Sequence, residues 1–144
     1  MPDRDTMQAL IEEVAALVQG DDEMQTIVGT PVRFYDEWAE QDAEFPYFVS
    51  LATLRQNVED ALQVADLRID AWDEGPSRLR MFAMRRRLIT LLNKRTIPAG
   101  EFRSACYLAS DFGMSQPEVE VWRRCLSFTV RLYPITEIAA MQAR

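Results

Sequence analysis

The sequence predicts an α+β fold in which two helices pack on one face of a four-stranded, mostly antiparallel sheet. Two long segments repeat apolar residues at helical spacing, and other segments alternate apolar and polar residues with a period of two. These segments follow each other in the order helix, strand, strand, helix, strand, strand. The simplest arrangement that buries both helical stripes places the two helices side by side on one face of the sheet.

The first predicted helix is capped at its start by Asp5 or Thr6, and Gly20 ends it. A short second turn, residues 21–28, follows, and residues 32–35 are extended in character. The apolar residues that recur at helical spacing and form the buried stripe of the first helix are Met7, Leu10, Ile11, Val14, Leu17 and Val18.

The segment from Asp36 to Glu44 is predicted to be an exposed loop. It holds five carboxylates and one aromatic residue, Trp38, without any periodicity. We predict that this polar segment is mobile in the free subunit and becomes ordered at an interface, with its aromatic side chain as an anchor. The candidate interface residues in it are Asp36, Glu37, Trp38, Glu40, Asp42 and Glu44.

Four strands are predicted in the rest of the chain. The first begins after Pro46, and a polar turn at residues 57–60 separates it from the second. The third, residues 102–109, alternates weakly, and Pro134 ends the last. In the second and last strands, the residues expected to face the core are Leu67, Ile69, Ala71, Leu126, Phe128, Val130 and Leu132. The sheet face without helices is expected to carry Phe48, Leu54, Trp72 and Tyr133. An apolar face without a helical cover suggests a neighbouring subunit.

Residues 75–77 stop the second strand and cap the second long helix, which ends before Pro98. Its buried stripe consists of Met81, Met84, Leu88, Leu91 and Leu92. Arg80, Arg87 and Lys94 recur every seven residues and are expected on the opposite face of this helix. They are candidates for a basic surface that meets a partner's acidic one, and the alternative is a helix face that is simply solvated.

Charge is distributed unevenly along the chain. Residues 1–72 hold 16 acidic and 4 basic side chains, a net charge of −12, whereas residues 73–144 hold 7 acidic and 12 basic side chains, a net charge of +5. The overall charge of −7 argues against general nucleic-acid binding, which requires a basic surface. Either the two halves neutralise each other within one subunit, or the acidic half of one copy contacts the basic half of the next.

The sequence offers little for catalysis. It contains no histidine, so the commonest general base and metal ligand is missing, and its five glycines form no phosphate-binding loop. Cys106 and Cys125 lie in separate apolar stretches and are expected to be reduced, half-buried thiols rather than zinc ligands. We therefore expect no enzymatic activity, no metal and no cofactor. No apolar run reaches the roughly 20 residues that cross a membrane, and the first residues lack a signal-peptide pattern, so a cytoplasmic protein is expected.

Several short patterns occur together in a fixed order. They are residues 27–35 (IVGTPVRFY), the acidic loop, residues 45–49 (FPYFV), residues 67–72 (LRIDAW), the arginine-rich helix and residues 122–130 (WRRCLSFTV). From about residue 7 to residue 133, the chain resembles the tail-completion, or tail-terminator, proteins of long-tailed bacteriophages, prophages and gene transfer agents. The acidic loop is richer in carboxylates than that family pattern, and a tail follows Pro134.

The resemblance implies a structural virion protein. Such proteins form a ring, usually a hexamer, that ends the tail tube and joins it to the head connector. The implied partners are copies of the chain itself, the tail-tube protein and the head-connector protein, around a lumen that admits DNA. The implied location is the host cytoplasm during assembly and then the tail or head-tail joint. A small adaptor or ligand-binding domain, acting through the acidic half or a sheet-helix cleft, is the alternative. The whole chain is expected to be one domain, with a core at about 6–133, the acidic loop at 36–44 and a tail at 134–144.

Overall fold

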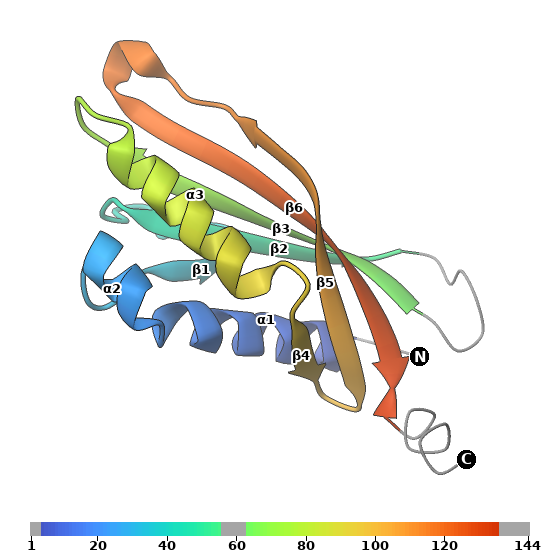
Figure 1. Cartoon of the computed structure of the whole chain (residues 1–144). Helices are drawn as coiled ribbons and strands as arrows, with labels where there is room; N and C mark the ends of the chain where they lie inside the picture. Colours follow the sequence, from blue (N-terminus) through green and yellow to red (C-terminus); the bar gives the residue numbers. More distant parts are fainter. Residues whose placement is uncertain (1–3, 56–62, 136–144) are drawn as a thin grey trace.

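The computed structural model describes residues 4–55 and 63–135, which form one curled sheet with three helices on one side (Figure 1). The six strands lie in the order β1-β2-β3-β6-β5-β4, and every neighbouring pair is antiparallel except β1 and β2. In chain order the elements are α1 (Arg4–Gln19), α2 (Asp22–Val28), β1 (Phe34–Asp36), β2 (Tyr47–Leu54), β3 (Gln63–Glu74), α3 (Leu79–Leu92), β4 (Thr96–Ala99), β5 (Phe102–Gly113), the 3-10 turn η1 (Pro117–Val119) and β6 (Val121–Pro134).

The predicted four-stranded, mostly antiparallel sheet with two helices is therefore wrong. The sheet gains β1, which pairs in parallel with β2, and β4, which adds an edge beside β5. The predicted turn at 21–28 is a third helix, α2, and its N-cap residue Asp21 accepts a 2.8 Å hydrogen bond from the Met24 N–H. The two extra strands contain only three and four residues, too few for an alternating pattern to identify them.

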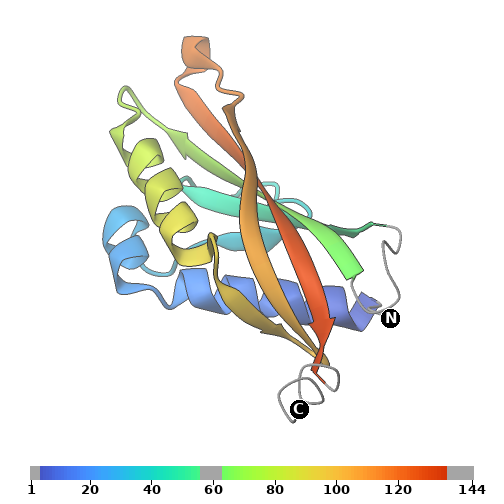
Figure 2. The same ribbon diagram turned by 45° about the vertical axis from the view of Figure 1, so that its right-hand side comes forward.

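The helices cover one face of the sheet, and their predicted apolar stripes form the core (Figures 1 and 2). The stripe of α3 is buried as predicted. In α1, four of the six predicted residues are buried, and Met7 and Leu17 are partly buried against the same core. This helix already begins at Arg4, so Asp5 and Thr6 lie inside it and not at its cap.

Alternation along the strands divides the sheet into a covered face and an outer face. The seven strand residues predicted to face the core are all buried beneath the helices, and Phe48 and Leu54 pack against the same core. The prediction that Phe48 and Leu54 lie on the uncovered face is therefore wrong. Trp72 does lie on the outer face, where it is paired with Tyr47, and so does Tyr133, paired with Arg103. The predicted turn at 57–60 lies outside the described residues.

The chain leaves α3 at Asn93, so Lys94 does not continue the helix and its row of arginines as predicted. Lys94 has a φ of 63°, and its N–H donates to the Cys106 carbonyl of β5 at 2.6 Å. The Asn93 Oδ1 accepts from the Leu108 N–H at 2.9 Å, just before the pairing of β5 with β6 shifts register. Beyond this shift the β5–β6 hairpin continues past the beginning of α3 (Figures 1 and 2).

Candidate interaction surfaces

The outer face of the sheet begins with a row of aromatic rings at its β1 edge. Tyr35 of β1 contacts Tyr47 edge-on at 5.8 Å between ring centroids, and Phe45 lies 5.2 Å from Tyr47. Tyr47 stacks on Trp72 of β3 at 6.0 Å, because these two residues are directly opposite in the β2–β3 ladder. The rings cover the outer face of three neighbouring strands, where no helix lies.

The row of rings ends on an arginine–carboxylate cluster. The Arg123 guanidinium lies 4.6 Å from the Trp72 ring centroid and donates to the Asp70 carboxylate at 2.6 Å. Arg68 donates to the other side of the same carboxylate at 2.8 Å. Burial raises the pKa of Asp70, but the hydrogen bonds from Arg68 and Arg123 outweigh it, so the pKa lies below its usual range. Asp70, only 6% exposed, is therefore ionised and fully engaged at neutral pH.

A hollow on the outer face lies against this cluster. It is lined by Glu37, Val49, Ser50, Leu51, Arg68, Asp70 and Arg123. Its two arginines are held by Asp70, so the charge that they offer to a ligand is already balanced. Among the described residues, the space between the helices and the sheet holds the apolar core.

The predicted basic surface on α3 is largely occupied by carboxylates of the same chain. Arg80 holds Asp73 at 2.6 Å, and Arg87 holds Asp21 at 2.6 Å and Glu23 at 2.9 Å. The hydrogen bond from Arg87 outweighs burial and lowers the pKa of Asp21. Arg87 thereby fixes the residue that caps α2, so part of the opposite charge of the two halves is neutralised inside one subunit.

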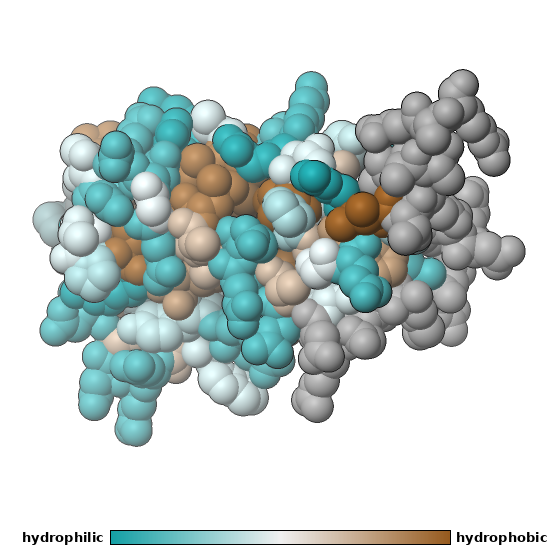
Figure 3. Space-filling model, turned by 90° about the horizontal axis from the view of Figure 1, so that it is seen from below, coloured by the Kyte–Doolittle hydropathy of each residue, from teal (hydrophilic) through white to brown (hydrophobic). Residues whose placement is uncertain are grey.

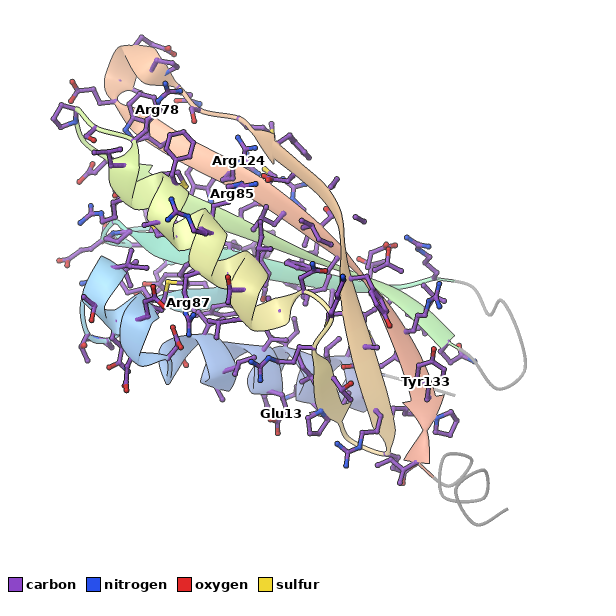
Figure 4. The ribbon with its side chains drawn as sticks, in the orientation of Figure 1. Glu13, Arg78, Arg85, Arg87, Arg124 and Tyr133 are labelled. Atoms are coloured by element: carbon purple, nitrogen blue, oxygen red, sulfur yellow. The ribbon has the colours of Figure 1, made fainter. Side chains whose placement is uncertain are left out.

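A second arginine–carboxylate cluster joins α3 to the β5–β6 hairpin. Arg85 of α3 and Arg124 of β6 both reach Asp111 of β5, each with an N···O distance of 2.5 Å, and Figure 4 shows the two arginines side by side. Burial raises the pKa of Asp111, and the two arginines lower it further than burial raises it. The ion pairs with Asp111 therefore hold the β5–β6 hairpin against α3 where the apolar core ends.

At the far end of the hairpin, Arg78 lies between two aromatic rings (Figure 4). Its guanidinium is 5.7 Å from the Phe82 ring centroid and 5.5 Å from the Trp122 ring centroid. The Trp122 Nε1–H donates to the Gly75 carbonyl at 2.8 Å and so ties β6 to the turn before α3. The large apolar side chains left exposed around this end are Leu79, Phe82, Met114 and Val119.

Asp36 is the last residue of β1, and the other predicted acidic residues follow it in the loop between β1 and β2. The loop is anchored at its start, where the Glu37 N–H donates to the Ser50 carbonyl at 2.7 Å. Glu44 pairs with Arg33 at 3.0 Å, and the Asp36 carboxylate accepts from the Ser50 hydroxyl at 3.2 Å. Within the described chain, the carboxylates of Glu37, Glu40 and Asp42 contact no basic side chain. The structure does not bring the loop onto Arg80, Arg87 or Lys94 of its own subunit.

Further aromatic and basic residues lie on the outer face of β5 and β6, and of these only Tyr133 was expected there from the sequence. They are Arg103, Tyr107, Arg131 and Tyr133, and the register places Arg103 opposite Tyr133. The Arg131 guanidinium lies 5.6 Å from the Tyr107 ring centroid. The signal available in the sequence was the alternation of β6, which predicts that Arg131 points away from the core.

A view from below shows the underside of the molecule, near α1 and β4, as apolar patches interrupted by hydrophilic side chains (Figure 3).

The two thiols are fully buried, deeper than the half-buried positions expected. Cys106 faces the core opposite Val130, whereas Cys125 lies on the outer face opposite Phe112, so they do not pair. Burial raises the pKa of Cys106 to about 11 and also raises the pKa of Cys125. Across residues 4–55 and 63–135, no three Cys, Asp or Glu residues gather in a metal-binding arrangement. No helix of those segments has the length and apolar character that would span a bilayer.

Comparisons with known proteins give a match in fold and none in sequence. No family model matches the chain, and no curated protein matches its sequence. Among solved structures, a chain from the virion of a native gene transfer agent particle aligns with a TM-score of 0.74 and 16% identity, over 91% of this chain and 99% of that one. Another solved chain, which carries no descriptive name, aligns with a TM-score of 0.64 and 8% identity, over 93% of this chain and 99% of that one. The protein therefore has the fold of a subunit found in a gene transfer agent virion.

Proposed function

We propose that the chain is a structural protein of a phage-type virion, which forms a ring at the end of the tail tube and joins the tube to the head connector. The observation that carries this proposal is the fold match to a gene transfer agent virion chain, which extends over nearly the whole length of both chains. The resemblance of the sequence to tail-terminator proteins leads to the same class of particle by a separate route.

The surfaces of the subunit support an assembly role. Aromatic and arginine side chains are enriched at protein interfaces, and both are abundant on the uncovered face of the sheet. The proposed partners are further copies of the chain, the tail-tube protein and the head-connector protein, with DNA passing through the lumen. The whole chain acts as a single domain, without catalysis, first in the host cytoplasm and then at the head-tail joint.

A small adaptor or ligand-binding protein is the second candidate. The hollow beside Asp70 favours it, because polar groups converge there on an otherwise open sheet face. The paired state of the arginines weighs against a charged ligand, since binding would have to break their contacts with Asp70.

Mass photometry of the purified protein separates the two candidates. A ring protein should give a species of several times the 16.6 kDa subunit mass, six times for a hexamer, alone or with tail-tube protein. Negative-stain images of that species should show closed rings at tube ends. A protein that stays monomeric at every concentration, with and without tail-tube protein, would contradict the ring and favour the adaptor.

A further inference from the structure

Basic side chains of the described chain fall into two groups, those already paired with a carboxylate and those left unpaired. Those that form ion pairs are Arg33, Arg55, Arg68, Arg80, Arg85, Arg87, Arg123 and Arg124. Arg103 and Arg131 belong to the second group: no acidic side chain of residues 4–55 or 63–135 reaches them. Arg80 and Arg87, the two arginines of α3 that the sequence suggested for a partner, are therefore in the paired group.

Two of the unpaired arginines, Arg103 and Arg131, belong to one exposed strip on the outer face of β5 and β6. The strip consists of Arg103, Tyr107, Arg131 and Tyr133, and its two rings are 42% (Tyr107) and 36% (Tyr133) exposed. The Arg131 guanidinium packs over the Tyr107 ring, so these two side chains are held in position before a partner binds. Arginine and tyrosine on a firm sheet are typical of residues that contribute most to binding energy. Lys94 adds a further positive charge beside β5, and Glu101 in the β4–β5 turn is the nearest acidic residue in sequence.

The acidic loop of residues 36–44 offers the complementary chemistry. It carries five carboxylates and no basic residue, and three of the carboxylates contact no basic side chain in the described chain. The Trp38 side chain is 79% exposed. Exposure of a large indole to water is unfavourable, and burial of the ring at an interface would remove that cost. The loop therefore combines negative charge with one large aromatic side chain, which suits a surface of arginines and tyrosines.

The loop and the strip lie toward opposite edges of the same sheet. The loop follows β1, which is one edge strand, and the strip lies on β5 and β6, beside the other edge strand β4 (Figure 1). A contact between unlike surfaces on two copies leaves one of each surface free, so it repeats from copy to copy and closes into a ring when the rotation allows. We propose that the acidic loop of one copy docks on the strip of the next copy, a contact that rests on the proposed ring function.

Charge reversal on the strip tests the contact. In Arg103→Glu/Arg131→Glu, two favourable contacts become repulsive ones, which should raise the protein concentration at half-assembly at least about tenfold. The fold should be unchanged by circular dichroism, because neither arginine holds a carboxylate of its own subunit. Arg86→Glu is the matched control: it reverses an exposed, unpaired arginine of α3, away from the strip, and should assemble like the wild type.

Rescue makes the test specific. Adding Glu40→Arg/Asp42→Arg to the double reversal exchanges the charges across the interface and should restore much of the assembly, and raised salt should weaken the wild-type ring. If the wild type forms rings and the double reversal assembles as well as the Arg86→Glu control, the docking proposal is wrong while the ring stands. If the wild type forms no ring even with tail-tube protein, both the ring and the docking contact are wrong.

Discussion

The two faces of the central sheet use the same strands for different purposes. On the covered face, β3 and β6 present Leu67, Ile69, Leu126 and Phe128, which are completely buried under the helices. On the outer face, the same two strands present rings, arginines and the Asp70 carboxylate. The covered face is stabilised mainly by apolar burial, whereas around Asp70 the outer face holds buried charge by pairing it. Strand alternation thus lets one sheet carry both a core and a potential interface.

The largest expected effect comes from a change on the covered face. Phe128→Ala removes a fully buried ring from the middle of β6 and should lower the free energy of unfolding by about 3–5 kcal/mol. Thr129→Ala changes the next residue, on the outer face, and should cost less than about 1 kcal/mol. Urea denaturation of both variants measures the difference. Equal losses would show that the two faces contribute alike to stability.

A smaller loss is expected at the buried charge of the outer face. Asp70→Asn leaves Arg68 and Arg123 without their shared carboxylate and should cost about 2–3 kcal/mol, below the range for fully buried pairs because both arginines are partly exposed. Asp66→Asn is the matched control, since the Arg55–Asp66 pair is about half exposed and should contribute less than about 1 kcal/mol. If both variants unfold at the same urea concentration, the Asp70 cluster adds no stability.

Two neighbouring arginines of α3, Arg86 and Arg87, allow the effect of an unpaired charge on stability to be compared with that of a paired one. Arg87→Glu sets a carboxylate against Asp21 and Glu23 and should lower the free energy of unfolding by about 1–2 kcal/mol, because the cap of α2 loses its partner. Arg86→Glu, one residue earlier, breaks no ion pair and should change it by less than about 0.5 kcal/mol. Thermal unfolding followed by circular dichroism distinguishes them. Two equal melting curves would mean that the Arg87 contacts contribute nothing in solution.

The helix stripes and the alternation of β3 and β6 could be read from the sequence because periodicity over many residues specifies a buried face. The short strands could not. In β1 only three residues pair, and β4 contains Pro98, which normally marks the end of an element. The residues of the covered face were therefore predicted more completely than the strands at the sheet edges.

The candidate surfaces were less accessible to sequence reasoning. Arg87 and Asp21 are 66 positions apart, so no local pattern reveals that they meet. Arg80 and Arg87 therefore seemed free for a partner, whereas Arg103 and Arg131, spaced on two strands, were not recognised as one surface. Residues 37–44 are a mostly exposed segment between β1 and β2, and composition alone marks such a segment. Its mobility and its partner remain predictions.

The smallest effect concerns pH, and it sharpens the contrast between the faces. The pKa of Asp70 is lowered in the folded state, so its contribution to stability is complete above its unfolded pKa of about 3.9 and is lost as the pH falls through the lower folded value. The difference in unfolding free energy between wild type and Asp70→Asn should therefore shrink in acid. Urea unfolding at neutral pH and near pH 3 measures it, and the Phe128→Ala cost should show no matching change. A constant Asp70→Asn cost would mean that folding does not lower the pKa of Asp70.

The brevity of the two edge strands bears on how copies behave when crowded. An open sheet leaves its outermost backbone groups unpaired, and long flat edges invite strands of other molecules to add and aggregate. Here one edge strand, β1, has three residues, and the other, β4, has four. One of the four is Pro98, which has no backbone N–H to donate. Beyond β4, Asn93 occupies the Leu108 N–H of β5, and a register shift follows. At high local concentration, association is therefore directed to contacts between side chains, which can be selective, and away from indiscriminate backbone pairing.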